Sequence, residues 1–425
     1  MTLRDKKGFR WAILALVSVS MLCAYYLSDA LAPLELHLEA LLNWSASDYG
    51  FYSGAYGWFN IFLFMLIFGG MILDRKGVKF TGLLAISIML LGAGIKYGAI
   101  SGIAGTEIVS LKIGQWNIFS VKQTALMAGL GFAVFGVGVE MFGITANKAV
   151  IRWFKGKELA LAIGLNTSVG RIGTALAMFT PLPLVNLTKN LSAPVILSIL
   201  LLFVGLIAFI YFSFLDKKLD KEELENQAPS EEEFKFRDLK EIAKIKAFWL
   251  ITILCVLFYS AVFPFIKYVT QLIIQKFGIP DDSAGYIPAL LPFGALILTP
   301  VFGNLYDKKG KGATIMIIGS VLLIFVHLLF AIPSLNSLYV AIGLVLILGV
   351  AFSLVPSAMW PSVAKIIPEK NVGTAYAITF WVQNWGIMLV PMLIGYVLDK
   401  YCITGKTIKL IGSVEKEVTL YDYTL

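Results

Sequence analysis

The sequence predicts an all-α, polytopic membrane protein, and three observations carry that prediction. Of the 425 residues, 58% are hydrophobic and 15% are charged, whereas a water-soluble globular protein averages about 25% charged residues. Apolar runs long enough to cross a bilayer follow one another along the chain. Lysine and arginine gather in every second connection between these runs. Together these observations exclude a water-soluble globular domain and an intrinsically disordered chain.

Eleven apolar runs are the predicted membrane-spanning helices. An α-helix rises ~1.5 Å per residue, so ~20 residues cover a hydrocarbon core of ~30 Å. The predicted spans cover residues 10–32, 49–73, 78–100, 118–147, 157–183, 191–214, 246–275, 283–305, 312–331, 337–364 and 371–397. The tail after Asp399 is polar and contains no twelfth apolar run.

The distribution of basic residues predicts a cytoplasmic N-terminus. In that orientation every cytoplasmic connection holds a basic cluster, and before the tail the opposite connections hold only Lys112, Lys122, Lys189 and Lys276. The net charge of +8 is therefore a topology signal and not a sign of nucleic-acid binding. Because eleven is an odd number, we expect the C-terminal tail on the outer face.

One stretch differs in composition from the rest of the chain. Residues 216–246 are dominated by Asp, Glu and Lys and contain no apolar run, which is typical of a polar linker with at most a short surface helix. We therefore expect an N-terminal bundle at residues 1–214, a cytoplasmic linker at 215–245, and a C-terminal bundle with its polar tail at 246–425.

A short motif occurs once in each half, directly after the second span of that half. Its pattern is Gly, three residues, Asp, a basic residue, any residue and Gly. We expect the glycines to let neighbouring helices approach, and the charges to join helix ends in one conformation and release them in another. A loop that only fixes topology would explain the basic residues but not the repeated Asp and Gly. The candidate gating residues are Gly70, Asp74, Arg75, Gly77, Gly303, Asp307, Lys308 and Gly310.

This motif resembles the signature loop of the major facilitator superfamily. The resemblance runs from the first span to the eleventh and implies two six-helix bundles related by a pseudo-twofold axis, of which the twelfth helix is not visible here. Residues 153–174 and 352–376 are similar to the branch that contains the lysosomal dipeptide uniporter. The N-terminal segment has no acidic dileucine sorting signal, so a lysosomal address is not supported. We expect a bacterial inner (plasma) membrane.

Glu140 and Arg171 are the strongest pair of charges inside predicted spans. Spans four and five form a hairpin whose turn centres near residues 155–156, so both residues lie ~23 Å along their helices from the turn and at the same depth. Nearby glycines leave room beside them. The resemblance implies that Glu140 holds the ammonium and Arg171 the carboxylate of a zwitterionic peptide. The alternative is a structural salt bridge between the two helices.

Other polar and aromatic side chains at membrane depth complete the candidate site. Asp29 contacts substrate, accepts a proton, or is merely solvated near a helix end; Lys267 is a gate, a second anion contact, or a residue that extends to the interface. Two adjacent amides in span eleven face the solute or bond to another helix. The further candidates for substrate binding are Tyr25, Tyr26, Asp29, Lys267, Trp360, Trp381, Gln383 and Asn384.

The leading interpretation is an alternating-access transporter of small zwitterionic solutes, above all dipeptides, by facilitated diffusion. The alternative is a proton-coupled symporter or antiporter of a small carboxylate or other small metabolite, with Asp29 or Glu140 titrating. A membrane receptor or scaffold would not need paired charges at one depth. An enzyme is not expected, because the chain has two histidines, no metal-ligand cluster and no phosphate loop. The expected partners are the lipid bilayer and the solute, without cofactor or nucleic acid.

Overall fold

The computed structural model describes residues 3–105, 107–113, 116–154, 157–225, 242–367, 372–411 and 414–424. We call residues 3–225 the N half and residues 242–424 the C half. The N half contains η1 (Leu3–Asp5), α1 (Lys7–Asp29), η2 (Ala32–Leu34), α2 (Glu35–Leu42), α3 (Ala46–Gly54), η3 (Ala55–Gly57), α4 (Trp58–Phe62), α5 (Met65–Ile100), β1 (Ile108–Ile113), β2 (Trp116–Lys122), α6 (Gln123–Phe154), α7 (Leu159–Phe179), α8 (Pro181–Thr188) and α9 (Ala193–Glu225). The C half contains α11 (Lys246–Phe277), α12 (Asp281–Ala284), α13 (Tyr286–Lys309), α14 (Gly312–Phe330), α15 (Leu338–Ile366), α16 (Val372–Tyr401), β3 (Ile403–Ile411) and β4 (Val414–Tyr421).

The predicted fold class is confirmed. Within the described residues, nine helices are long and apolar enough to cross a membrane, or ten if the bent pair 161–179 and 181–188 counts as one span. The predicted total was eleven. The difference arises at the second predicted span, which is built from α3, η3, α4 and the start of α5 instead of one helix. The label α5 covers two helical segments that meet at a kink, where Gly77 has the non-helical angles φ +77° and ψ 175°. The end of the second predicted span and the whole third span therefore share one label, and the predicted break between them is present.

Apolar side chains on the outside of the bundle agree with a lipid environment. Large hydrophobic residues that project from α9 and α14 are exposed, which would be costly in water over faces of this size. In α9 they include Leu200, Phe203, Ile207 and Phe214, and in α14 they include Ile317, Val321, Ile324 and Leu328.

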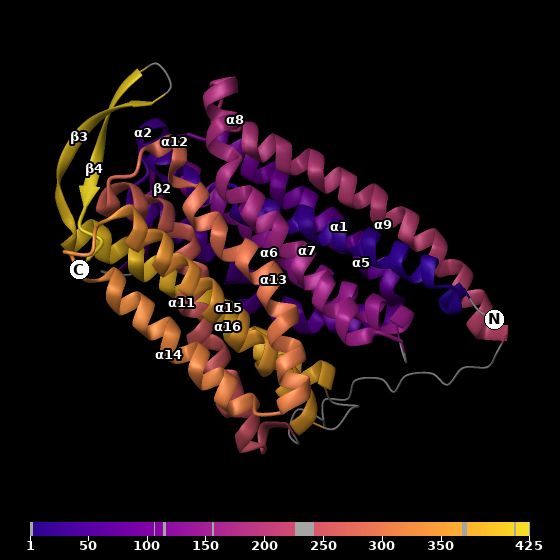
Figure 1. Cartoon of the computed structure of the whole chain (residues 1–425). Coiled ribbons are helices and arrows are strands. Elements are labelled where there is room, and N and C mark those ends of the chain that lie inside the picture. Colours follow the sequence, from indigo (N-terminus) through magenta and orange to yellow (C-terminus); the bar gives the residue numbers. More distant parts are fainter. Residues whose placement is uncertain are drawn as a thin grey trace.

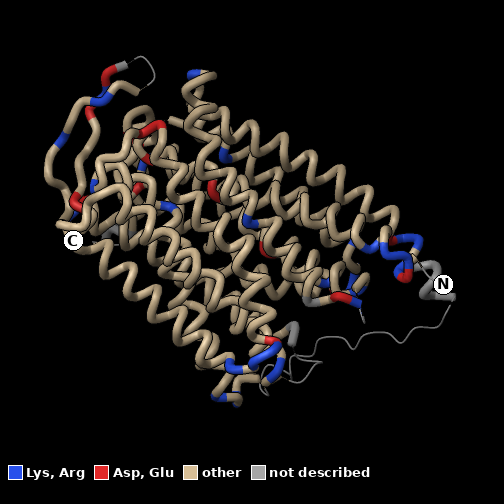
Figure 2. The backbone as a smooth tube through the Cα atoms, viewed as in Figure 1, with Lys and Arg blue, Asp and Glu red and all other residues tan. Residues whose placement is uncertain are grey.

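The two ends of the bundle differ in charge (Figures 1 and 2). The "basic end" is the end with the N-terminus and the turns that follow Asp74 and Asp307, where Lys and Arg gather. The "hairpin end" is the end that carries β3, β4 and the C-terminus. The two chain termini therefore lie at opposite ends of the molecule, as the odd number of predicted spans requires.

Two β-hairpins were not predicted. Strands β1 and β2 pair antiparallel between α5 and α6, so α6 begins at Gln123 and not at residue 118. The segment 116–122 holds four apolar residues among seven. A search for apolar runs cannot tell so short a strand from the start of a helix. The polar tail forms the second hairpin, from β3 and β4.

The tail hairpin contacts both halves. The Thr419 backbone N–H donates to Glu39 Oε1 of α2 at 2.7 Å, and the Tyr421 N–H donates to Gln275 Oε1 of α11 at 2.6 Å. The Tyr421 hydroxyl donates to Asp399 Oδ1 at 3.0 Å. Burial, together with the charges of Asp399 and Glu39, raises the pKa of Tyr421, so the phenol keeps the proton that it donates.

The first part of the predicted linker is helical. Helix α9 continues past residue 214 to Glu225. Asp216 is buried and accepts a hydrogen bond from Trp153 Nε1 at 2.8 Å and an ion pair from Arg152 at 3.1 Å. The N half therefore extends beyond its expected boundary because this acidic residue is bonded to α6. Residues 226–241 of the linker lie outside the described residues.

Candidate functional site

Arg171 of α7 lies where the two halves meet. Its guanidinium carbon is 4.6 Å from the ring centroid of Phe352 on α15, 5.6 Å from that of Phe263 on α11, and 5.4 Å from that of Tyr25 on α1. Two of these three rings belong to the C half. A cation over an aromatic face gains about 0.5–2 kcal/mol, so the rings hold the guanidinium in place without neutralising it.

Glu140 of α6 also faces groups from outside its own helix. The Tyr56 hydroxyl of η3 donates to Glu140 Oε1 at 3.0 Å. The buried amide of Asn384 on α16 interacts with the same carboxylate. The partners of Glu140 are therefore neutral donors, one from the N half and one from the C half.

Glu140 and Arg171 lie in one region, as their predicted depth requires, but they do not bond to each other. The Tyr25 side chain is within electrostatic range of both charges. Among the described residues neither charge forms an ion pair, and both side chains are partly exposed. The salt bridge that the sequence left as an alternative is thus absent from this conformation. Each charge remains available for an oppositely charged group.

Glycines place the helices that carry these charges. A Cβ atom on Gly173 would lie 2.1 Å from the carbonyl oxygen of Leu22 on α1, and one on Gly136 would lie 2.4 Å from that of Tyr56. Both positions therefore require glycine. The expected close approach is present, and it brings α1 and η3 against the two charge-bearing helices.

Aromatic residues of the C half extend from Arg171 to Trp360. The Phe263 ring stacks on Tyr259 at 5.0 Å between centroids. The Tyr259 hydroxyl accepts a hydrogen bond from Trp360 Nε1 at 3.3 Å, and Trp360 stacks on Phe380 at 4.8 Å. Trp360, which the sequence nominates as a substrate contact, lies at the far end of this aromatic surface.

Three other candidates point elsewhere in this conformation. The Tyr26 hydroxyl bonds to Thr180 Oγ1 at 2.8 Å, on a different face of α1 from Tyr25. Gln383 is buried and accepts from the Cys255 thiol at 3.4 Å. Trp381 Nε1 donates to the Ile61 carbonyl at 3.2 Å. Adjacent residues on a helix point ~100° apart, so Tyr25 and Tyr26 could not both face Arg171.

Asp29 and Lys267 form an ion pair across the halves. The Lys267 Nζ of α11 lies 2.6 Å from Asp29 Oδ1 and 2.6 Å from the Ser28 carbonyl oxygen at the end of α1. This pair joins the halves near the hairpin end. Because the two charges are paired with each other, in this conformation neither Asp29 nor Lys267 is directed toward the region of Glu140 and Arg171, where a substrate would bind.

Lys96 is a buried charge that sequence reasoning missed. It lies four residues before the end of α5, where a lysine is expected to reach the surface, yet its relative exposure is 0%. Its Nζ donates to the Leu27 carbonyl at 3.3 Å and lies over the Phe132 and Tyr52 rings. The sequence did contain a signal for it. Lys96 lies inside the apolar run 78–100, near the end that faces the connections with few basic residues.

Backbone contacts close the hairpin end between α16 and the broken span of the N half. Three glycines at helical spacing on α3 and η3 face α16, where a side chain would collide with main chain. A Cβ atom would lie 2.4 Å from Pro391 O if built on Gly50, 2.4 Å from Met388 O on Gly54, and 3.0 Å from Asn384 O on Gly57. The halves are therefore in direct backbone contact here.

Asp399 of α16 strengthens the same contact. Its carboxylate accepts from the backbone N–H groups of Ala46 at 3.1 Å and Ser47 at 2.7 Å, the first residues of α3. An anion at a helix N-terminus is stabilised by unpaired N–H groups and the helix dipole. A side chain of one half thus binds the start of a helix in the other. In Figure 1 the halves diverge toward the basic end.

The two gating motifs share a positive φ at their second glycine but differ in ψ, which is 175° at Gly77 and -36° at Gly310, and in bonding. Gly77 and Gly310 have φ values of +77° and +73°, a conformation that favours glycine. Asp74 pairs with Lys148 of α6 at 2.9 Å, while Asp307 is exposed with no ion pair among the described residues. The expected helix approach at the first glycines is wrong for this conformation. Nothing lies within 4 Å of a Cβ atom built on Gly70 or Gly303.

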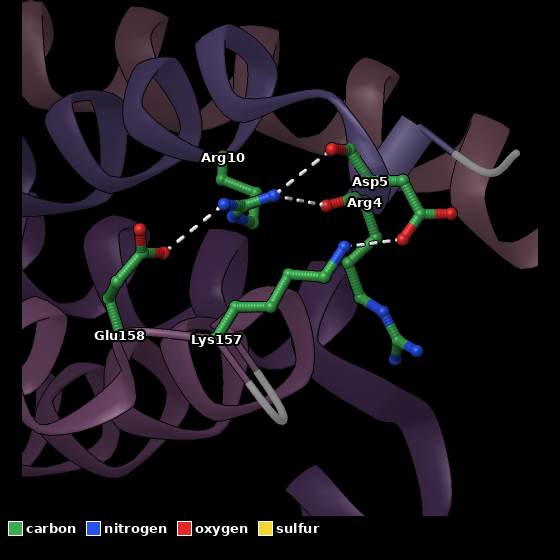
Figure 3. Close-up of polar contacts among 5 residues, drawn as sticks. All are labelled: Arg4, Asp5, Arg10, Lys157 and Glu158. Carbon is green, nitrogen blue, oxygen red and sulfur yellow. Dashed lines mark hydrogen bonds and ion pairs between the residues drawn. The ribbon is translucent and has the colours of Figure 1, made fainter.

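Charges at the basic end also join the N-terminal segment to the turn between α6 and α7 (Figure 3). Arg10 donates to the Arg4 carbonyl at 2.9 Å and the Asp5 carbonyl at 3.2 Å, and pairs with Glu158 at 3.1 Å. Lys157 pairs with the Asp5 carboxylate. These basic residues therefore join parts of the N half to one another.

The described residues contain no group of three or more His, Cys, Asp or Glu that could hold a metal ion. The chemistry that the site offers is non-covalent. It consists of one anion and one cation, unpaired with each other, beside aromatic rings and amides from both halves.

Comparison with known proteins places the chain among membrane transporters. Residues 14–391 match the sequence profile of the Major Facilitator Superfamily. The human lysosomal dipeptide transporter MFSD1 is 28% identical over 405 residues, which cover 93% of this chain and 81% of that protein. The bovine protein of the same name is 27% identical over 400 residues, covering 92% and 80%. The Escherichia coli (strain K12) inner membrane transport protein YdiN is 29% identical over 124 residues, covering 29% and 28%.

Solved structures share the architecture at low sequence identity. A crystal structure of the nucleoside transporter NupG superimposes with a TM-score of 0.65 at 14% identity, covering 92% of each chain. The D-xylose–proton symporter superimposes with a TM-score of 0.67 at 12% identity, covering 92% and 91%. At these identities the likeness establishes the fold alone, and it confirms the predicted architecture of two helix bundles.

Proposed function

This chain belongs to the Major Facilitator Superfamily, and we propose that it is an alternating-access carrier of dipeptides that works by facilitated diffusion. Membership of the family makes it an integral membrane transporter and not an enzyme, as the sequence predicted. One observation carries the finer proposal: Glu140 and Arg171 lie at the meeting of the halves without an ion pair among the described residues. The similarity to MFSD1 proteins, which are named as dipeptide transporters, supports it.

The charges suit the two ends of a dipeptide. An extended dipeptide separates its ammonium and carboxylate by ~7 Å, because each residue spans ~3.5 Å. Arg171 offers a planar fork of donors that can bind a carboxylate through two hydrogen bonds. Glu140 offers a carboxylate to the ammonium. Side chains of the peptide would then pack on the aromatic surface that runs from Phe263 to Trp360.

Contact with both halves gives the ligand a way to influence conformation. Arg171 belongs to the N half but rests on Phe263 and Phe352 of the C half, and Glu140 interacts with Asn384 of the C half. A ligand that binds both charges changes contacts that cross between the halves. Differential contact in two states is what a ligand needs to shift a conformational equilibrium.

We propose that the basic end is cytoplasmic and that the membrane is a bacterial plasma membrane. The concentration of Lys and Arg at the basic end supports this orientation through the positive-inside rule (Figure 2). In this orientation the conformation described here is closed on the outside, because the contacts of Gly54, Asp399 and Lys267 lie at the hairpin end.

Proton-coupled transport of a small carboxylate is the second candidate. The observation that favours it is that Glu140 has only neutral partners among the described residues, so it can exchange protons as well as bind an ammonium. The two candidates differ in their ligand and in their response to a pH gradient. Uptake that needs an inward proton gradient would support this second candidate.

Thermal stabilisation of the purified protein separates the ligand classes. At 100 times its Kd a ligand stabilises by about 2.7 kcal/mol, so we expect a dipeptide to raise Tm by several degrees. A free amino acid and a monocarboxylate, each offering less than the full pair of separated charges, should raise it little. The proposal fails if the monocarboxylate stabilises the protein and the dipeptide does not.

The ion pair of Asp74 gives a prediction for the gating motifs. We expect Asp74→Asn to change the ratio of conformations open at the basic end and at the hairpin end by up to about fivefold, because exposed ion pairs contribute up to ~1 kcal/mol. Dipeptide affinity within either conformation should stay unchanged. Asp307→Asn is the matched control, with a smaller effect because Asp307 forms no ion pair among the described residues. Distances between spin labels report the ratio; equal effects from both variants would contradict this account.

A further inference from the structure

Lys96 and Lys267 lie on the same small group of atoms at the end of α1. Lys96 Nζ donates to the Leu27 carbonyl at 3.3 Å, and Lys267 Nζ lies 2.6 Å from the Ser28 carbonyl and 2.6 Å from Asp29 Oδ1. The two ammonium groups also share the Phe132 ring, at 4.6 Å and 5.4 Å from its centroid. Lys96 is within electrostatic range of both Asp29 and Lys267.

The two lysines belong to different halves. Lys96 is on α5 and Asp29 on α1, both in the N half, whereas Lys267 is on α11 of the C half. When the halves separate at the hairpin end, Lys267 leaves with the C half. Asp29 and Lys96 stay together. Opening would therefore leave Asp29, which is buried, without its partner unless another cation takes its place.

We propose that Lys96 is the second partner of Asp29 and forms an ion pair with it when the hairpin end opens and Lys267 moves away. A buried carboxylate that loses its only cation is strongly destabilised, so an exchange between lysines keeps the open state accessible. Lys96 is then a positioning residue for the conformational change. This inference rests on the alternating-access part of the proposed function and not on the identity of the solute.

The position of Lys96 fits this role better than a structural one. In the closed conformation its ammonium has one carbonyl at 3.3 Å and two aromatic rings, and no ion pair among the described residues. A fully buried ammonium is costly without an anion. A methionine of similar length would fill the same space without that cost. The lysine is therefore best explained by an interaction that forms in another conformation.

The experiment measures the open fraction with spin labels at the hairpin end, without any solute. Suitable positions are Leu187, 83% exposed on α8, and Tyr339, 85% exposed on α15, which lie in different halves. The native cysteines, Cys23, Cys255 and Cys402, are buried. Leu187→Cys and Tyr339→Cys are labelled, and the distance distribution is recorded by double electron–electron resonance. The background variants are Lys96→Met, Lys267→Met, Asp29→Asn and Lys96→Met combined with Asp29→Asn.

We expect Lys267→Met to raise the open fraction and Lys96→Met to lower it, each by about tenfold or more. In the Asp29→Asn background, Lys96→Met should change the open fraction by no more than about twofold, because position 29 then carries no negative charge that needs a partner. Melting curves confirm that each variant is folded. The inference is overturned if Lys96→Met leaves the open fraction unchanged, or if Lys267→Met does not favour opening. It is also overturned if Lys96→Met changes the open fraction by the same factor with Asn at position 29 as with Asp. Because no peptide is added, failure of the dipeptide proposal leaves this result intact.

Discussion

Replacing Arg171 by Met should weaken dipeptide binding by between about 30-fold and several thousand-fold. That range corresponds to ~2–5 kcal/mol, the usual cost of leaving one member of a desolvated charge pair without its partner. The unpaired group would be the peptide carboxylate. Arg171→Lys keeps the charge but loses the planar fork, so we expect an intermediate loss. Titration calorimetry with a free dipeptide gives the Kd for the unaltered protein, Arg171→Met and Arg171→Lys.

Blocked ligands test whether this loss comes from the carboxylate itself. A C-amidated dipeptide should bind weakly to the unaltered protein and no more weakly to Arg171→Met, since the contact is already missing. N-acetylated dipeptide and Glu140→Gln should behave in the same way at the other end. If Arg171→Met weakens the free and the amidated dipeptide by equal factors, Arg171 acts through its packing on Phe263 and Phe352 and not through the ligand.

Gly54→Leu should hold the hairpin end open and stop transport. A Cβ atom at this position would lie 2.4 Å from the Met388 carbonyl oxygen and 2.9 Å from Met392 Cγ, both on α16 of the other half. The main-chain atom cannot move aside as the end of a side chain could. The leucine would therefore prevent the closed contact between the halves, and the label distance between positions 187 and 339 should move to the open value.

Two matched variants separate gate blockage from misfolding. Gly94→Ala is the control without a steric clash, because nothing lies within 4 Å of a Cβ atom at Gly94. It should keep transport and raise Tm slightly, since Ala favours a helix by about 1 kcal/mol over Gly. Gly173→Leu would meet the Leu22 carbonyl within the N half at 2.1 Å, so it should lower Tm. Gly54→Leu should lose transport with little change in Tm. Normal transport by Gly54→Leu would show that this contact is not needed for the cycle.

Sequence periodicity was sufficient for the features that depend on long apolar runs. It located most spans, the repeated loops and the pair of charges on spans four and five, because lipid demands long apolar helices and makes buried charges rare. The depth of Glu140 and Arg171 followed from counting residues to a common turn. The sequence did not predict that Glu140 would bond to Tyr56 and Arg171 would rest on aromatic rings instead of pairing with each other, because these contacts depend on packing between the halves.

Features set by contacts distant in sequence were missed. The second span is broken into α3, η3 and α4, and its glycines make sense only against α16, which is more than 300 residues away. Lys96 looked like a helix-end residue until Leu27, Tyr52 and Phe132 were found around it. The β-hairpins were missed because short alternating segments between spans carry little signal beside runs of twenty apolar residues.

Counterflow in proteoliposomes tests the central claim most directly. Vesicles loaded with an unlabelled dipeptide should accumulate labelled dipeptide from outside without an imposed proton gradient, and vesicles that contain Arg171→Met protein should not. Loading with the C-amidated or N-acetylated peptide should drive little accumulation. The account is contradicted if both blocked peptides drive exchange as well as the free dipeptide does, because the carrier would then recognise its solute without Glu140 and Arg171 binding the two charged termini.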